Sequence, residues 1–250
     1  MKQHAHTRVV RSIGLARALS KLGYCSRAQA FLSIRAGKIK LNGRICRDGE
    51  TPVMLGKDSI EVEGRAVTAT EKIYLMLNKP RGLVTTTADE KGRDTVYSCL
   101  PTGLPYIAPV GRLDKASEGL LLMTNDSEWA ARVTDPSSHL PKTYHVQVAA
   151  RPRAEHMAAL RKGIAVKDGE VLRLLSVQEL RHGEKNAWLE IVLEEGKNRH
   201  IRRMMEALGV EVLRLVRVAI GPLQLGNLAK GEVRRLTHAE VAGLHRASGL

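Results

Sequence analysis

The stretch GRLDKASEGLLLMTND, residues 111–126, contains a candidate for a catalytic carboxylate. Asp114 lies between Arg112 and Lys115 in the loop that precedes a long apolar run. A strand that only fills a core does not require an acid at this point, whereas a nucleophile presented on a loop does. A loop aspartate can equally cap a helix or pair with Arg112 or Lys115, so the residue type alone leaves both interpretations open.

Two further stretches contain side chains that could act beside a carboxylate. Tyr144 lies in KTYHVQV, where polar and apolar residues alternate as in a half-buried strand. Arg202 lies in EGKNRHIRRMM, where apolar residues from Ile201 to Leu208 recur at helical spacing before Gly209, so we predict a helix. A strand tyrosine can also fill a core, and every basic residue of this helix can also contact phosphate.

Within this predicted helix, Arg202 lies at the border of the apolar stripe rather than opposite it. Arg199 and Arg203 are four residues apart and can face solvent or RNA. The pattern thus distinguishes Arg202 from the exposed cations of the same helix.

The elements that must position these side chains form a mixed pattern from residue 73 onwards. KIYLMLNKP predicts a strand stopped by Pro80, and GLLLMTND, VLRLLSVQEL, NAWLEIVLEE and EVLRLVRVAI predict further strands. AEHMAALRKGI predicts a helix that ends at Gly163. Strands outnumber helices and come partly as hairpins, so we expect an α+β fold with a mixed, mainly antiparallel sheet and flanking helices.

Residues 12–66 have the pattern of a small helix–helix–hairpin unit. Ser26 followed by Gln29 predicts the capping box of a helix, and Asn42-Gly43 predicts a tight turn between two strands. Residues 67–72 are a short polar segment and are predicted to be a linker. The basic residues of the unit include Arg17, Lys21, Arg27, Arg35, Lys38, Lys40 and Arg44.

The formal net charge of +14 is concentrated in two parts of the chain. Residues 1–70 carry 13 Lys/Arg against 5 Asp/Glu, residues 196–236 carry 9 against 3, and residues 71–195 carry 17 of each. Each Lys or Arg placed on a phosphate releases counterions, so segregated positive charge favours a nucleic acid as partner. A cytosolic protein that is merely basic is the alternative.

The composition argues against several classes of protein. Hydrophobic residues make up 43% of the chain, which opposes global disorder, and no apolar run reaches the roughly 18 residues of a membrane span. The start of the sequence lacks the apolar region of a signal peptide, and Cys25, Cys46 and Cys99 are widely spaced. We therefore expect a cytoplasmic protein with reduced thiols and no membrane partner. We also expect a monomer, because no self-complementary apolar stripe stands out.

No cofactor is indicated. The three cysteines form no CxxC pair, and His4 and His6 are too isolated to predict a metal site. Neither G-x-G-x-x-G nor G-x-x-x-x-G-K-[ST] occurs, so the usual nucleotide-cofactor signatures are absent. We expect a protein that acts without a metal or a bound cofactor.

SRAQAFLSIRAGKIKLNG, within residues 12–66, resembles the alpha-L RNA-binding motif, a small domain shared by a small-subunit ribosomal protein and many RNA-modifying enzymes. Known members lay this face on structured RNA. Together with GRLDKASEGLLLMTND, KTYHVQV and EGKNRHIRRMM, it resembles the RsuA-type pseudouridine synthases up to near residue 236. The resemblance implies an alpha-L RNA-binding domain at residues 12–66 and a catalytic domain at 73–236. Beyond the resemblance, the residues THAEVAGLHRASGL of the tail at 237–250 predict a short final helix that frays.

The resemblance also implies a reaction, the isomerisation of uridine in ribosomal RNA to pseudouridine. The bond from C1′ to N1 breaks, the base turns, and it rejoins through C5 without redox change or cofactor. The family pattern makes Asp114 the nucleophile, with Arg202 paired to it so that the carboxylate stays ionised and oriented. It makes Tyr144 the residue that stacks on a flipped-out base and assists proton removal from C5. Attack on C1′ and reaction through a glycal both stay open, and so does the choice of uridine.

Other residues are candidates for contacts with RNA or with the base. Arg112 could insert into the vacated stack or contact phosphate. The segment around Ile220 and Leu223 would add an apolar wall to the base pocket, although the residues alone predict core. The candidate RNA contacts are Arg17, Arg27, Lys38, Lys40, Arg112, Arg199 and Arg203.

The chain departs from the usual family pattern at two positions. Ser127 stands where glycine is common, and His200 stands where glutamine is usual before Ile-Arg. Neither departure removes a candidate catalytic residue. NKPRG, residues 78–82, matches a family turn that we expect to be architectural. The alternative function is a ribosome-assembly factor that binds RNA without chemistry; it would be marked by loss of Asp114 or Arg202, and both are present.

Overall fold

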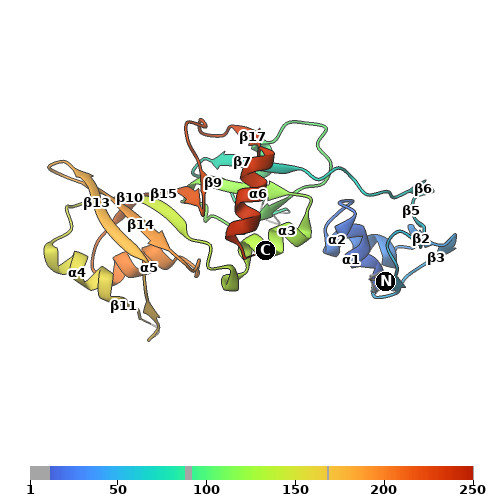
Figure 1. Cartoon of the computed structure of the whole chain (residues 1–250), viewed down its shortest axis with the longest axis horizontal. Coiled ribbons are helices and arrows are strands. Elements are labelled where there is room, and N and C mark those ends of the chain that lie inside the picture. The colour runs from blue at the N-terminus through green and yellow to red at the C-terminus, as the bar shows by residue number, and fades with distance from the viewer. Residues whose placement is uncertain (1–11, 88–91, 168, 250) are drawn as a thin grey trace, which may run out of the picture. The chain divides into compact units, whose positions relative to one another are not determined.

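The computed structural model describes residues 12–87, 92–167 and 169–249, which form two compact units (Figure 1). The first unit comprises residues up to 73 together with residues 103–108 and 125–127. The second comprises residues 74–102, 109–124 and 128 onwards. His4 and His6 lie outside the described residues.

The first unit contains a helix pair and small antiparallel sheets. Its helices are α1 (Leu15–Lys21) and α2 (Arg27–Arg35), and its four-stranded sheet has the order β3-β2-β5-β6. The strands are β1 (Ile13–Gly14), β2 (Ile39–Leu41), β3 (Arg44–Ile45), β4 (Pro52–Val53), β5 (Ile60–Val62) and β6 (Arg65–Ala66). Apolar side chains from helices and strands form one core, so the predicted helix–helix–hairpin unit is confirmed.

Two local signals of this unit are also confirmed. The Ser26 hydroxyl accepts from the Gln29 amide at 3.1 Å, and the Gln29 side-chain oxygen accepts from the Ser26 amide at 3.0 Å. This is the predicted capping box, and it satisfies two amides that the first turn of α2 leaves open. Asn42 and Gly43 have φ angles of 51° and 77°, as the tight turn between β2 and β3 requires.

The second unit is built on a nine-stranded sheet with the order β13-β14-β10-β15-β9-β7-β17, to which β8 and β16 add. Neighbouring strands in this order run antiparallel, except β9 and β15, which run parallel. The strands are β7 (Tyr74–Lys79), β8 (Ala108–Val110), β9 (Glu118–Thr124), β10 (Lys142–Val148), β13 (Ser176–His182), β14 (Ala187–Leu193), β15 (Val212–Ile220), β16 (Leu223–Gln224) and β17 (Val233–Arg235). The predicted α+β class with a mixed, mainly antiparallel sheet is confirmed.

Strand β9 lies between β7 and β15, and all seven of its residues are buried. This burial explains the continuous apolar run in its sequence, because a central strand covered on both faces does not alternate. The parallel pairing with β15 covers only two residue pairs, Glu118 with Val216 and Gly119 with Arg217. A side chain at position 119 would overlap the backbone of Arg217, so glycine permits this close approach.

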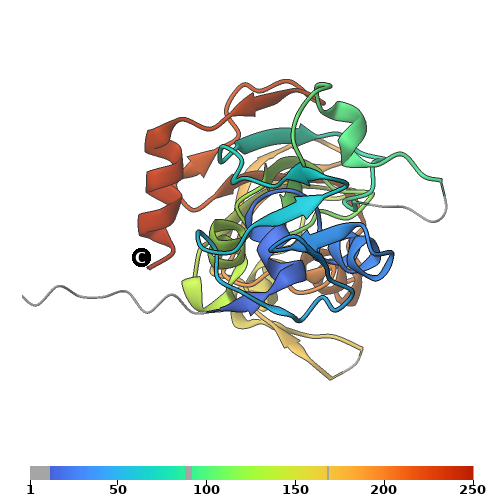
Figure 2. The same ribbon diagram turned by 90° about the vertical axis from the view of Figure 1, so that its right-hand side faces the viewer.

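The helices of the second part of the chain are α3 (Ser127–Thr134), α4 (Ala154–Lys162), α5 (His200–Ala207) and α6 (His238–Ala247). A short hairpin of β11 (Ile164–Ala165) and β12 (Val171–Leu172) follows α4, and 3-10 turns span Val96–Cys99 and Pro136–Ser138. Helix α6 lies beside the strands of the second unit (Figures 1 and 2). Its Leu244 is fully buried in a core cluster with Met76, Leu120 and Trp129.

None of the helices in the described part of the chain combines the length and apolar character that crossing a bilayer would need.

Candidate active site

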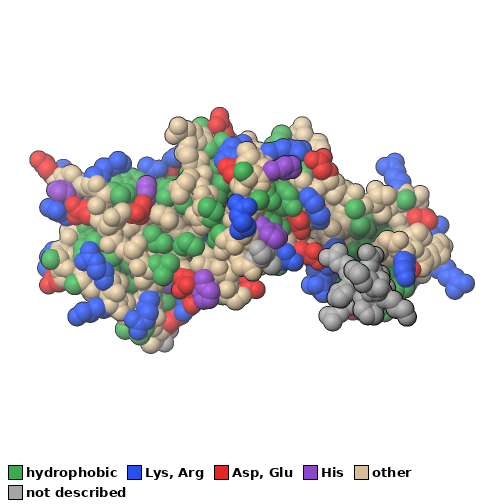
Figure 3. Space-filling model, viewed as in Figure 1, with side chains coloured by type: hydrophobic (Ala, Val, Ile, Leu, Met, Phe, Trp, Pro, Cys, Tyr) green, Lys and Arg blue, Asp and Glu red, His purple; other side chains and the backbone are tan. Residues whose placement is uncertain are grey.

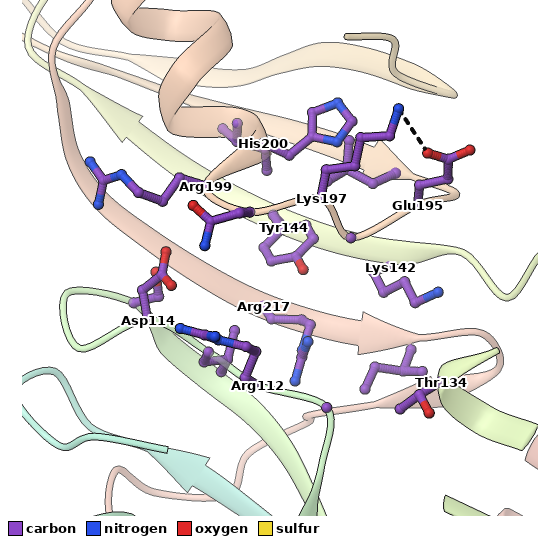
Figure 4. Close-up of a pocket in the computed structure, with 18 of the residues that line it drawn as sticks. Arg112, Asp114, Thr134, Lys142, Tyr144, Glu195, Lys197, Arg199, His200 and Arg217 are labelled. Atoms are coloured by element: carbon purple, nitrogen blue, oxygen red, sulfur yellow. Dashed lines mark ion pairs between the residues drawn. The ribbon is translucent and has the colours of Figure 1, made fainter. Parts of the chain in front are cut away.

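A cavity of about 540 Å³ opens within the second unit (Figure 4). Its walls come from the loop after β8, the end of α3, strands β10 and β15, and the segment that leads from β14 into α5. The residues predicted for the site that line this cavity are Arg112, Asp114, Tyr144, Arg199 and Ile220.

The loop that carries Asp114 is held at five consecutive backbone carbonyls, those of residues 113–117. The Leu113 carbonyl accepts from the Thr85 hydroxyl at 2.8 Å, and the Lys115 carbonyl accepts from the Gly82 amide at 2.8 Å. Both donors come from the segment that follows β7. The family turn at residues 78–82 therefore contacts the loop directly, in agreement with an architectural role.

Two cations, one buried and one half-buried, hold the other carbonyls of the loop. The Lys79 ammonium donates to the carbonyls of Asp114 at 3.2 Å and Ser117 at 2.8 Å. The Arg202 guanidinium donates to the carbonyl of Ala116 at 3.0 Å. A turn closes between them, because the Ser117 amide donates to the Asp114 carbonyl at 2.9 Å. These hydrogen bonds fix the backbone of the loop, and none of them involves the side chain of Asp114.

The carboxylate of Asp114 is half-buried and points into the cavity (Figure 4). Across the described residues it forms neither a hydrogen bond nor an ion pair, including with Arg112 or Lys115, and no helix begins at it. The loop therefore presents a carboxylate that no structural contact occupies.

Arg202 reaches the same loop through the backbone rather than through the carboxylate. Besides Ala116, its guanidinium donates to the Val212 carbonyl at 3.5 Å. Burial lowers the pKa of Arg202, the charge of Arg199 lowers it further, and the charge of Asp114 raises it. Asp114 is thus close enough to act on Arg202 electrostatically, but the expected direct pair is absent from the ion pairs of the described residues.

Tyr144 and Arg217 are neighbours on adjacent antiparallel strands, β10 and β15. Both are buried, with 8% and 6% of their surface exposed, and both line the cavity. Figure 4 shows the Tyr144 ring inside the cavity with its hydroxyl directed towards the side of Arg217. An aromatic face, an unoccupied carboxylate and a basic wall therefore meet in one cavity.

The comparisons with known proteins agree with this arrangement. Residues 73–207 match the family described as RNA pseudouridylate synthase, and residues 13–58 match the S4 domain. The chain belongs to the RNA pseudouridylate synthase family. The predicted family is thereby confirmed, and the chain is a pseudouridine synthase with an S4 RNA-binding domain.

Relatives of similar length support this assignment. The chain is 36% identical over 234 residues to ribosomal large subunit pseudouridine synthase B of Bacillus subtilis (strain 168), covering 92% of this chain and 94% of that protein. It is 36% identical to an uncharacterized RNA pseudouridine synthase of Aquifex aeolicus (strain VF5), covering 93% of both. A crystal structure of a pseudouridylate synthase superposes with a TM-score of 0.65 at 32% identity, covering 93% of this chain and all of that one.

Some predicted residues of this pseudouridine synthase lie away from the cavity wall. Leu223 is buried in the core cluster and pairs with Ile220 across the turn from β15 to β16, so only Ile220 reaches the cavity. Arg203 forms an ion pair with Glu170 at 2.9 Å, because it faces the β11–β12 hairpin.

Arg199, by contrast, lines the cavity. It lies at the start of α5 and has a left-handed backbone conformation, with φ 48°.

The predicted RNA contacts of the S4 domain lie on its surface. Arg17, Arg27, Lys38 and Lys40 are all exposed, and Lys38 also pairs with Glu63 at 2.9 Å. Figure 3 shows basic side chains on the visible faces of both units, interspersed with acidic ones. These exposed cations agree with a surface that binds a polyanion.

Sequence reasoning missed three cations of the cavity, Lys142, Lys197 and Arg217. Burial lowers the pKa of Lys142, the nearby charge of Arg217 lowers it further, and Glu194 opposes both. One signal was present for Arg217: it occupies a buried position of the alternating strand β15, where Leu215 and Ala219 are apolar. An arginine at such a position needs a partner, and part of that partner is the Leu120 carbonyl, to which Nε donates at 2.8 Å.

His200, which departs from the family pattern, is buried at the start of α5 and lines the cavity. Burial lowers its pKa, and the nearby backbone of Arg173 opposes this shift. Within the described residues neither ring nitrogen forms a hydrogen bond. Burial therefore disfavours the charged form of this histidine at the first residue of α5.

Proposed function

We propose that this pseudouridine synthase isomerises a specific uridine of ribosomal RNA in the cytoplasm, using Asp114 as the nucleophile on a flipped-out base. The observation that carries the proposal is the unoccupied carboxylate of Asp114 on a loop whose five carbonyls all accept hydrogen bonds. A nucleophile held in this way loses little freedom when the substrate binds. The name of the Bacillus subtilis relative supports ribosomal RNA as the substrate class.

In the proposed reaction the C1′–N1 bond of uridine breaks and its electron pair stays on the uracil. Asp114 either attacks C1′ and is displaced when C5 bonds there, or removes the C2′ proton to leave a glycal and returns that proton when C5 bonds to C1′. The uracil then turns, C5 bonds to C1′, the proton on C5 leaves, and N1 gains a proton. The product is an isomer of the substrate, so the reaction needs no oxidant, reductant or group donor.

Other side chains of the cavity have proposed roles in holding the base. Tyr144 offers an aromatic face for the extruded uracil, which repays part of the cost of unstacking, and its hydroxyl could assist proton removal from C5. Ile220 adds an apolar wall. Arg202 fixes the loop through the Ala116 carbonyl and brings a positive charge close to Asp114. Arg112, an exposed residue of the cavity wall, could contact phosphate or fill the vacated stack.

The proposed partner is ribosomal RNA, either free or in an assembling subunit, bound by the S4 domain and by the basic wall of the cavity. The protein would act as a monomer. An RNA-binding assembly factor without activity is the competing function, and it predicts binding without a modified nucleotide.

A pseudouridine map tests these two functions. Ribosomal RNA from a strain lacking this protein is incubated with the wild type or with Asp114→Asn, and carbodiimide adducts are located by reverse-transcription stops. A stop produced only by the wild type supports the enzyme and identifies its uridine. Equal RNA binding by both proteins with no stop, on free RNA and on subunits, would support the assembly factor.

A further inference from the structure

Arg217 is a buried cation whose guanidinium is only partly used by the protein. It is 6% exposed, and Nε donates to the Leu120 carbonyl at 2.8 Å. Neither Nη nitrogen donates to a group of the described residues, and Nη2 is fully buried. A buried charged donor without an acceptor is costly, so its position beside a cavity suggests an acceptor that arrives with a ligand.

The position of Arg217 indicates which part of a ligand it meets. It is paired in the sheet with Tyr144, and side chains at paired positions on one face lie in contact range. A base stacked on Tyr144 would therefore present a polar edge to Arg217. The arginine is also far more buried than Arg112 and Arg199, which are exposed on the cavity wall and better placed for phosphate.

We propose that Arg217 is a catalytic residue that stabilises the uracil anion formed when the C1′–N1 bond breaks; this inference rests on the proposed function. The electron pair of the broken bond stays on the uracil, where the negative charge is shared among N1, O2 and O4. An N–H of Arg217 donates to one of these carbonyl oxygens and keeps its proton throughout. A preorganised, buried cation is an effective stabiliser of such developing charge.

The symmetry of uracil allows one arginine to serve both halves of the reaction. The turn that replaces N1 by C5 at C1′ can occur about the line through N3 and C6. That rotation also exchanges O2 and O4. A fixed donor beside the ring therefore meets a carbonyl oxygen before the turn and an equivalent one after it. Nε, held by Leu120, keeps the donor in place while the base moves.

The test compares uridine with 5-fluorouridine at the mapped position of the same RNA. Fluorine withdraws electrons and stabilises the uracil anion, so bond cleavage needs less help from a cation. In single-turnover reactions at saturating enzyme, followed by mass spectrometry of nucleoside digests, we expect Arg217→Gln to slow consumption of uridine by about 100-fold. We expect Arg217→Gln to slow the consumption of 5-fluorouridine by a clearly smaller factor. Equal deficits on the two substrates would overturn the proposal and indicate a structural or phosphate-binding role.

Further variants keep the test decisive. Arg217→Lys retains a charge in case the glutamine variant fails to fold, and its deficit should also be larger for uridine than for 5-fluorouridine. Arg181→Gln removes an arginine of β13 that does not line the cavity and should leave both rates unchanged. Asp114→Asn should abolish both reactions. A wild type that consumes neither substrate would contradict the proposed function itself, whereas an active wild type with equal deficits contradicts only the role of Arg217.

Discussion

The ammonium nitrogen of Lys79 donates to the backbone carbonyl of Asp114 at 3.2 Å, from a side chain that is fully buried. The same ammonium also donates to the carbonyls of Ser117 and Pro80, at 2.8 and 3.1 Å. A cation and an acid of one site therefore meet through the main chain rather than as an ion pair. The loop gains a charged anchor, and the carboxylate stays available for substrate.

Because the Lys79 ammonium is buried, we expect the stability of the protein to depend on pH. Burial lowers the pKa of Lys79 from 10.5 to about 8, although the charges of Asp114 and Glu118 oppose the shift. Between pH 8 and 10.5 the unfolded chain then holds a proton on this lysine that the folded chain has lost, so the lysine's contribution to stability rises with pH. We expect the free energy of unfolding of the wild type to rise relative to Lys79→Met in this window, by at most about 1.4 kcal/mol per pH unit.

Urea denaturation of both proteins at pH 7.5, 9 and 10 measures this difference, because all other titrating groups are common to the two. A difference that stays constant with pH would mean that Lys79 keeps an ordinary pKa. At pH 7.5 the variant should also turn over RNA more slowly, since the carbonyls of Asp114 and Ser117 lose their donor.

A second prediction concerns the contact of β9 with β15. Gly119 has φ 100°, and a Cβ there would overlap the carbonyl oxygen of Arg217. Gly119→Ala should therefore cost about 3 kcal/mol of stability or more, measured by thermal and urea unfolding. Gly183→Ala is the matched control, because nothing lies near a Cβ at that position and its φ is unstrained. Similar small losses for both variants would refute the tight contact.

Glu118 carries a third prediction. It is buried, and both of its oxygens bind Arg214 at 3.0 Å while Lys230 approaches at 2.6 Å. Burial would raise its pKa, but these two cations outweigh it and hold the pKa below the ordinary 4.5. Glu118→Gln should lower the free energy of unfolding by about 2 kcal/mol at pH 7, because the buried carboxylate loses its charge-assisted hydrogen bonds to Arg214 and Lys230.

The pH dependence of the contribution of Glu118 to stability tests this prediction. The pKa is lowered in the folded state, so the stabilisation is present above pH 4.5 and is lost as the pH falls through the folded value. The gap between wild type and Glu118→Gln should narrow in urea titrations from pH 5 to pH 3. A gap that widens on acidification would contradict the lowered pKa.

Much of the fold could be predicted because its signals are local. The capping box of Ser26 and Gln29 spans four residues, and the turn at Asn42-Gly43 needs only a hairpin. The position of Arg217 could not be predicted in the same way. It depends on a parallel pairing with Gly119, almost a hundred residues earlier in the chain, which no local periodicity encodes.

In the candidate site, too, the local sequence indicated some features, whereas others depend on contacts between distant residues. The sequence motifs predicted Asp114 and Arg202 as site residues. They could not show that Arg202 contacts the Ala116 carbonyl rather than the Asp114 carboxylate. The packing of the final helix could not be predicted either, because Leu244 of α6 is buried in the core. Its burial depends on strands distant in sequence, such as β7 and β9.

The S4 domain supplies a fourth prediction. Arg17, Arg27 and Lys40 are exposed, so replacing all three by glutamine should weaken RNA binding while leaving the fold intact. The slope of log Kd against log salt should fall by about 0.7 to 0.9 for each phosphate that the variant no longer neutralises. Filter binding from 50 to 300 mM KCl measures it.

A matched removal of charge elsewhere is the control for this slope. Arg161, Lys162 and Lys185 are exposed residues of the second unit that do not line the cavity. Their replacement by glutamine should leave the slope nearly unchanged. If both triple variants lower it equally, net charge rather than the surface of the S4 domain determines RNA binding.

The last prediction separates two ways in which Arg202 could act. Its guanidinium bridges the carbonyls of Ala116 and Val212, and it lies close enough to Asp114 for the charge of Asp114 to raise the pKa of Arg202. If bridging is what matters, Arg202→Lys should be nearly as slow as Arg202→Gln, because a single ammonium cannot reproduce the planar fork. We expect both variants to lose roughly 10- to 100-fold in single-turnover rate with RNA affinity almost unchanged, since a displaced nucleophile affects the reaction more than binding. Rapid-quench kinetics with a parallel Kd measurement decides the matter. Recovery of most of the rate in Arg202→Lys would show that the positive charge near Asp114, and not the position of the loop, is what Arg202 contributes.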